Sequence, residues 1–294
     1  MGDESTGLLD RCHFPPRGTR VDLAVSGGAD STALLLLALA AGLLPTVHHV
    51  DHGSRAASAA DSSLVEALGA GLGVSVVVRR RSVERGPNFE SRARAARRAA
   101  LPRGVLTGHT MDDLAETVLI NLMRGAGFDG LAPMAGDPTK PMRDLRRAEV
   151  RDYVERSGFC PATDETNDDP AFARNRVRHE VLPLLNDVAR RDVVPVLARG
   201  AALMAAEREW LDALGAEGPA LDDVDCRELA TWPVARLRRW LRSRLASADE
   251  GDGVHPPSAA EVERVIAVVR GDAVAAELSG ARRVARRGQR LVVD

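Results

Sequence analysis

Short apolar runs alternate with helical patterns in the first half of the chain, and this alternation constrains the fold more than any other feature. Four runs rich in valine, leucine and other apolar residues predict strands at residues 21–25, 46–50, 74–78 and 105–107. Helical periodicity follows each of them, at residues 31–43, 59–71, 88–101 and 112–124. We therefore expect an α/β fold, with a doubly wound parallel sheet and helices on both of its faces.

The second half shows helical patterns without clear strands. Expected helices cover residues 147–157, 176–185, 187–214, 234–245 and 259–269, and Pro195 is expected to interrupt or kink the third of these. Residues 215–225 are rich in glycine, proline and acids and predict a linker, whereas residues 273–293 predict a short hairpin. We expect two domains, a catalytic one over residues 1–195 and a small, mainly helical one over residues 196–294.

Composition excludes several classes of protein. Lys140 is the one lysine among 40 basic residues, and Pro141 follows it, so no Walker A loop is present. The three cysteines are far apart, which argues against a zinc ribbon, an iron–sulfur site or a redox pair and suits a reducing cytoplasm. The longest apolar stretch, residues 33–44, is shorter than the roughly 20 residues of a membrane-spanning helix, so we expect no contact with a membrane.

A glycine-rich hexapeptide stands between the first expected strand and its helix. Two glycines let the backbone approach a phosphate group, and the helix that follows adds its positive N-terminal end. Its one acid can hold Mg²⁺. The alternative is an ordinary strand–turn–helix junction. The hexapeptide consists of Ser26, Gly27, Gly28, Ala29, Asp30 and Ser31. It resembles the phosphate loop of the PP-loop ATP pyrophosphatases, which cleave ATP between the α and β phosphates.

Four further segments narrow this resemblance. Two of them read H-T-M-D-D-L-A-E-T at residues 109–117 and F-A-R-N-R-V-R at residues 172–178. The other two are H-V-D-H-G-S-R at residues 49–55 and the segment from Asn88 to Arg97. In order and spacing, residues 20–190 resemble the tRNA(Ile)-lysidine synthases, and the last third is similar to the short form of that family.

The resemblance implies a two-step ligation that uses ATP and Mg²⁺. The C2 oxygen of the wobble cytidine of tRNA(Ile) with a CAU anticodon attacks the α-phosphorus of ATP. The ε-amine of free L-lysine then displaces AMP, giving lysidine. The resemblance also implies that residues 196–294 bind tRNA.

The expected site residues fall into three groups. The catalytic candidates follow the fourth strand and are His109, Asp112, Asp113 and Glu116. ATP is expected to bind the hexapeptide, from Ser26 to Ser31, together with Asp51, and Asp30 is the expected metal ligand. The candidates for contact with tRNA are Arg94, Arg97, Arg174, Asn175 and Arg178.

Elementary chemistry supports the acidic group. The amine of lysine has a pKa of about 10.4, so a carboxylate that binds the ammonium can also take its proton. Asp112 and Glu116 are four residues apart and share a helix face. The alternative is that these acids only complement the helix dipole. Structural roles for His109 and Asp51, and solvated faces for the arginine clusters, also stay open.

Two rival functions remain at this point. One is a PP-loop tRNA thiolase, which would need catalytic cysteines, whereas Cys12, Cys160 and Cys226 lie outside every motif. The other is a paralogue that binds RNA or nucleotide but catalyses no reaction. The complete loop and the complete acidic segment argue against this second function. The sequence leaves the oligomeric state open, a homodimer included.

Overall fold

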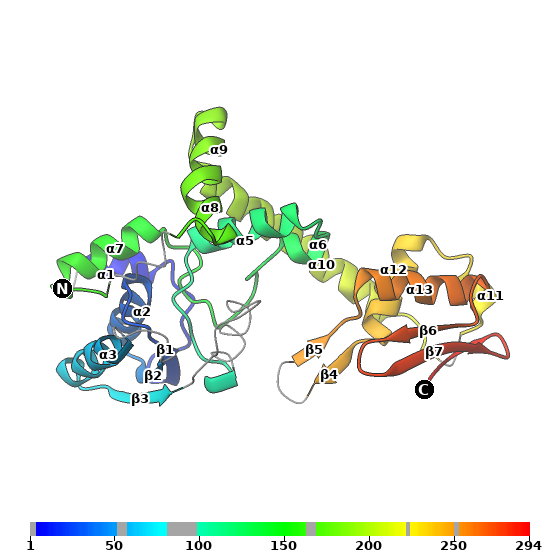
Figure 1. Ribbon diagram of the computed structural model, residues 1–294, viewed down its shortest axis with the longest axis horizontal. Helices are drawn as coiled ribbons and strands as arrows, with labels where there is room; N and C mark the ends of the chain where they lie inside the picture. The colour runs from blue at the N-terminus through cyan, green and yellow to red at the C-terminus, as the bar shows by residue number, and fades with distance from the viewer. Residues whose placement is uncertain (1–3, 52–57, 81–98, 163–168, 222–223, 250–252) are drawn as a thin grey trace. The chain divides into compact units, whose positions relative to one another are not determined.

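The computed structural model describes residues 4–51, 58–80, 99–162, 169–221, 224–249 and 253–294. The chain forms two compact units, Met1–Met204 and Ala205–Asp294 (Figure 1). The expected domain boundary at residue 195 stays a prediction. No helix among the described residues is long and apolar enough to cross a membrane.

A parallel sheet forms the centre of the first unit. Its strands are β1 (Arg20–Ala24), β2 (Leu44–Asp51) and β3 (Ser75–Arg80), hydrogen-bonded in that order. Leu106 forms a parallel bridge with Leu23 on the other side of β1. The expected fourth strand is therefore reduced to one bridge, because Thr107 N donates to Thr139 O and the chain leaves β1 there.

The order of the strands indicates at which end of the sheet a ligand would bind. The chain moves outward from β1 to β3 and then returns to the opposite side of β1 at Leu106. Right-handed crossovers put α2 (Ala29–Ala40) and α3 (Ser58–Leu72) on one face of the sheet. Ligands bind at the carboxyl ends of strands where such a reversal occurs, which here is the end of β1.

The hydrophobic core holds α2 and α7 in place on the sheet. Leu34, Leu35 and Leu37 of α2 are fully buried against Leu23 and Val47 of the sheet. The helix α7 (Arg147–Arg156) adds its apolar face to the same core, through Val150 and Val154. The N-terminal end of α7 is thereby held near that of α2.

A second group of helices completes the first unit. It consists of α5 (Met111–Met123), α6 (Phe128–Leu131), α8 (Ala173–Arg176), a π-helix (Val177–Val181), α9 (Leu182–Ala189) and the first half of α10 (Val194–Ala216), a helix that continues past Met204 into the second unit. Ala115 and Leu119 of α5 pack with Val177, Leu182 and Val194. This packing brings the arginines of α8 and the π-helix to α5.

The long helix expected over residues 187–214 is in fact two helices. Arg190 ends α9 in the left-handed conformation, with a φ of 53°. Asp192 accepts a hydrogen bond from Val194 N at 3.0 Å, and α10 begins there. Pro195 lies in the first turn of α10, where a proline suits a helix, so it neither interrupts nor kinks it.

The second unit contains helices and a sheet. Its helices are α11 (Cys226–Leu229), α12 (Val234–Arg244) and α13 (Ala259–Arg270). Its strands are β4 (Ser247–Asp249), β5 (Gly253–His255), β6 (Ala275–Leu278), β7 (Arg282–Arg287) and β8 (Arg290–Val293). The expected hairpin is thus an antiparallel sheet in the order β6-β7-β8, which buries Leu278, Val284 and Leu291 against the helices.

Candidate functional site

The glycine-rich loop follows β1 and leads into α2, as the sequence predicts. Gly27 has a φ of +91°, a conformation that residues with a Cβ rarely adopt. Ser31 Oγ accepts from Ser26 N at 3.1 Å and donates to Gly28 O at 2.9 Å, which closes the loop on itself. Gly28, the residue before α2, has no side chain that could cap the helix. Among the described residues, the N-terminal N–H groups of this 12-residue helix are therefore free of a side-chain cap, as an anion site requires.

Gly108 brings the end of the Leu106 segment against this loop. A Cβ at Gly108 would lie only 2.5 Å from Asp30 O and 2.8 Å from Asp30 C. Only glycine permits this approach, which places His109 and the start of α5 beside the phosphate loop. This role of Gly108 is not visible in the sequence, since a single glycine before His109 carries no spacing signal.

Glu116 lies at the centre of an acid–arginine cluster. Its side chain is fully buried, and three guanidinium groups surround it. Arg147 Nη1 lies 2.9 Å from Oε1, Arg174 Nε lies 2.7 Å from Oε2, and Arg178 Nε lies 2.8 Å from Oε1. This carboxylate is therefore shielded from solvent, and both of its oxygens are held by guanidinium groups.

Asp113 uses both of its carboxylate oxygens. Oδ2 accepts from the backbone N and the hydroxyl of Thr110, which caps α5. Oδ1 lies 2.9 Å from Arg147 Nη2 and 2.9 Å from Arg174 Nη2. Burial would raise the pKa of Asp113, but Arg147 and Arg174 outweigh it and lower that pKa to about 2. Asp113 therefore caps the helix and also belongs to the cluster.

Asp112 is paired separately. Its oxygens lie 3.2 Å from Nε and Nη2 of Arg146, and Arg147 N donates to Oδ2 at 2.7 Å. Its side chain is 15% exposed, so it is the most accessible acid of the predicted trio. The i, i+4 relation of Asp112 and Glu116 does not give them the same guanidinium partners, since Arg146 binds Asp112 while Arg174 and Arg178 bind Glu116. Arg147 contacts both acids, Asp112 through its backbone N and Glu116 through Nη1.

Asp30 connects the loop to this cluster. Its Oδ2 lies 3.7 Å from Arg147 Nε. Its Oδ1 is buried and has no hydrogen-bond partner among the described residues. Burial raises the pKa of Asp30, and the charge of Arg147 offsets this only in part. A buried, unpartnered carboxylate oxygen beside a phosphate loop fits a Mg²⁺ ligand, since Mg²⁺ often takes one or two carboxylates besides phosphate oxygens.

The remaining predicted residues have varied surroundings. His109 Nδ1 lies 2.8 Å from Thr107 Oγ1, at the end of the Leu106 segment. Asp51 ends β2, and its side chain is 12% exposed and 3.8 Å from Arg80. Asn175 is buried and donates to Asp169 O at 2.9 Å. Arg94 and Arg97 lie outside the described residues.

Residues 8–185 match the PP-loop domain family of ATP-binding proteins. A tRNA(Ile)-lysidine synthase of Thermobifida fusca is 36% identical, over 95% of this chain and 93% of its own length. That of Nocardia farcinica is 37% identical, over 87% of this chain and 84% of its own. The chain belongs to the tRNA(Ile)-lysidine synthase family. The resemblance inferred from the motifs is thereby confirmed.

One solved structure of a protein with a different name has a similar fold. The U34-tRNA thiolase NcsA from Methanococcus maripaludis, determined with its [4Fe-4S] cluster, is similar with a TM-score of 0.56. The match covers 69% of this chain and 79% of that one, at 16% sequence identity. It confirms the PP-loop fold and says nothing about shared chemistry.

The three cysteines of this family member are free and differ in their burial. Cys12 packs at the edge of the sheet core, and burial raises its pKa to about 12. Cys226 is buried in the second unit, and Cys160 is exposed. Within the described ranges, no group of three cysteine, histidine or acidic residues could hold a metal ion.

The arginines of α12 have partners within the second unit. Arg238 pairs with Glu263 at 2.5 Å and Arg239 with Asp212 at 2.5 Å. Arg244 binds the carbonyl oxygens of Ala216 and Pro219, so the expected linker packs against α12. These arginines stabilise the unit, and their contact with RNA remains a prediction.

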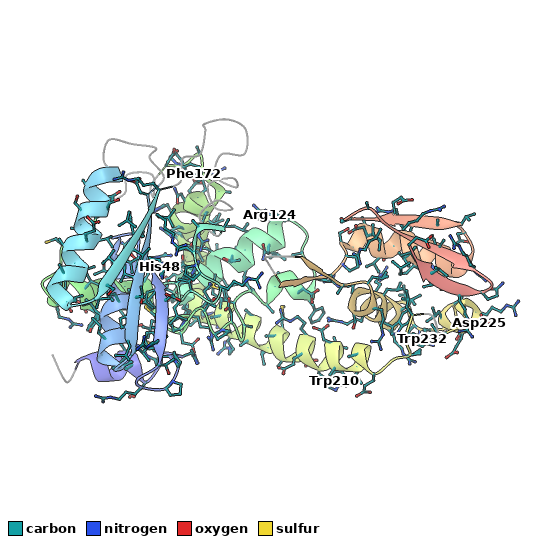
Figure 2. All side chains as sticks on the ribbon, turned by 90° about the horizontal axis from the view of Figure 1, so that it is seen from below. His48, Arg124, Phe172, Trp210, Asp225 and Trp232 are labelled. Atoms are coloured by element: carbon teal, nitrogen blue, oxygen red, sulfur yellow. The ribbon has the colours of Figure 1, made fainter. Side chains whose placement is uncertain are left out.

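Another arginine of this helix stacks on an aromatic ring. Figure 2 labels Trp232 in the second unit. Arg236 lies 3.8 Å above the ring of Trp232, which packs edge-on against Trp240 at 5.7 Å. A guanidinium over an indole face is a cation–π contact, which stabilises the unit locally. Arg236 therefore has a structural role in the second unit.

Proposed function

We propose that this chain attaches free L-lysine to C2 of the wobble cytidine of tRNA(Ile) with a CAU anticodon, at the expense of ATP. The products are lysidine, AMP and pyrophosphate. One observation supports this proposal most: the phosphate loop and the buried acid–arginine cluster lie next to each other at the end of β1. Gly108 packs so closely on Asp30 that a Cβ there would lie 2.5 Å from Asp30 O, and Arg147 Nε lies 3.7 Å from Asp30 Oδ2. The names of the curated relatives support tRNA(Ile) as the substrate.

The first proposed step is adenylation of the cytidine. The loop, from Ser26 to Ser31, and the N-terminus of α2 bind the pyrophosphate that leaves, which turns the α-phosphorus toward the tRNA. Asp30 is the residue that would hold Mg²⁺, which neutralises charge on the phosphates when bound. The attacking atom is the C2 carbonyl oxygen of the cytidine, so this step needs no amine.

The second proposed step is attack by the lysine amine. The ammonium must lose a proton before it attacks. With a pKa of about 2, Asp113 stays ionised at neutral pH, and it binds an ammonium well but accepts its proton weakly. We assign the negative charge of Asp113 to the attraction of the ammonium and leave proton transfer to the more exposed Asp112 or to His109. Glu116, fully buried among three arginines, holds this arrangement in place. The arginines around Glu116 hold Asp113 and Glu116 in place.

The proposed contacts with tRNA follow the family motifs. Arg94 and Arg97 are assigned to phosphates of the tRNA, as are Arg174, Asn175 and Arg178. Arg174 and Arg178 already bind Glu116, at 2.7 Å and 2.8 Å. Any contact of these two with the anticodon would therefore also connect tRNA binding to the acidic helix.

Mass spectrometry of nucleosides tests the proposal directly. The protein is incubated with CAU-anticodon tRNA(Ile), ATP and isotopically labelled lysine, and the tRNA is digested. A nucleoside heavier than cytidine by labelled lysine minus water is expected. The matched control is the same tRNA with uridine at the wobble position, which should stay unlabelled. Sulfur incorporation, or no change in either tRNA, would overturn the proposed function.

A further inference from the structure

Arg147, the first residue of α7, contacts carboxylates from two other helices. Nη2 lies 2.9 Å from Asp113 and Nη1 lies 2.9 Å from Glu116, both on α5. Nε lies 3.7 Å from Asp30, in the first turn of α2. The side chain is only 10% exposed. One buried guanidinium therefore spans the phosphate loop and the acidic helix.

These three contacts differ in quality. The two contacts with α5 are hydrogen bonds, whereas the contact with Asp30 is too long to be one. Arg147 Nε and Asp30 Oδ1 are both buried without a hydrogen-bond partner in the described part of the chain. The bonds to α5 hold the guanidinium back from Asp30. Buried polar atoms are nearly always satisfied, so two unsatisfied atoms on facing side chains point to a place that a ligand fills.

The packing of α7 explains why Arg147 can hold this position. Val150 and Val154, on the following turns, are fully buried in the core beneath α2. Glu149 accepts from Arg146 N at 2.8 Å and thereby caps the helix. The backbone of Arg147 is therefore fixed relative to the loop, and its side chain carries that position across to α5.

We propose that Arg147 is a positioning residue that sets the phosphate loop against the acidic helix. It keeps Asp30 open to a cation while it holds Asp113 and Glu116 in place for the amine. The inference rests on the proposed function and adds to it a residue that no motif singled out. A lysine at this position would keep the charge but lose the planar fork, so it could not bind three carboxylates in this geometry.

The test compares R147K with R156K. Arg156 lies on the same helix, in an exposed pair with Asp152 at 2.8 Å, and serves as the matched control. Three quantities are measured: the melting temperature, the single-turnover rate of tRNA adenylation without lysine, and the KM for lysine. We expect folded R147K to adenylate about ten-fold more slowly and to show a KM for lysine raised about ten-fold. R156K should stay within about two-fold of the wild type in both.

A loss in both the adenylation rate and the KM for lysine, in a variant that folds, distinguishes a positioning role of Arg147 from a purely structural one. Folded R147K with wild-type rates, or with a loss in only one of the two quantities, overturns the proposal. If R147K does not fold, R147Q is measured in its place, and if neither folds, Arg147 is a structural residue and the proposal is wrong. A wild-type protein that forms neither adenylated tRNA nor lysidine would show instead that the proposed function has failed, and the inference falls with it.

Discussion

Replacement of Gly108 by alanine should damage the site through a shift of about 1 Å. The added Cβ would lie 2.5 Å from Asp30 O and 2.8 Å from Asp30 C, whereas an ordinary contact needs about 3.4 Å or more. Both sides of the clash are backbone, so no side chain can rotate to relieve it. The first turn of α2 and the segment that carries His109 must therefore separate by nearly 1 Å.

A displacement of this size costs far more in catalysis than in stability. We expect kcat/KM for ATP to fall by about 100-fold, because a 1 Å misplacement of reacting groups has that effect. The free energy of unfolding should fall by only about 1–3 kcal/mol, as in other overpacked sites. Pyrophosphate release at varied ATP concentration gives the first quantity, and urea unfolding gives the second.

The control for this substitution is Gly200→Ala. Gly200 lies within α10, and a Cβ there would meet nothing within 4 Å. Alanine should therefore raise the free energy of unfolding by about 0.5–1 kcal/mol and leave the kinetics unchanged. A Gly108→Ala protein with kcat/KM for ATP within about three-fold of the wild type would refute the argument that this close approach sets the site.

Three further predictions concern single groups. Asp30→Ala should lower turnover by about 100-fold or more with the fold intact, and near-normal turnover at saturating Mg²⁺ would remove Asp30 as metal ligand. Loss of Arg94 or Arg97 should each reduce the salt dependence of tRNA binding by about one ion, measured by titration at several salt concentrations; unchanged slopes would return the segment to a solvated face. Asp113 has a folded-state pKa of about 2, below the unfolded value of about 3.9. It therefore stabilises the fold above about pH 4, and this contribution, about 2 kcal/mol, is lost as the pH falls toward 2. Urea unfolding between these pH values should show the loss in the wild type and not in Asp113→Asn, and equal pH dependence in both would contradict the assignment.

The parts of the site that sequence could predict are those with a local pattern. A buried strand, two glycines and a helix define the loop from Ser26 to Ser31, and the structure places it as expected. Asp112 and Asp113 fall in the first turn of α5 for the same reason, since Thr110 and Asp113 form a local capping box. Each of these features depends on neighbours within a few residues.

Features that depend on contacts distant in sequence were not predictable in the same way. Arg147 and its partner Glu116 are 31 positions apart in the sequence. In a chain with 39 arginines, no local pattern distinguishes Arg147 from the others. The partners of Arg174 and Arg178 were missed because a basic cluster indicates charge but not what neutralises it. The division between α9 and α10 was missed because the left-handed residue is Arg190, where glycine would have been a visible signal.

The most direct test of the account follows the fate of ATP in a single turnover. With α-labelled ATP, tRNA and no lysine, the protein should release pyrophosphate and slowly form adenylated tRNA. Addition of lysine should convert that species to lysidine and AMP. Asp112→Asn or Asp113→Asn should slow the second step more than the first if the acids serve the amine, and both steps equally if they hold Mg²⁺. ADP and phosphate as products would contradict the account, because they would mean transfer of the γ-phosphoryl group.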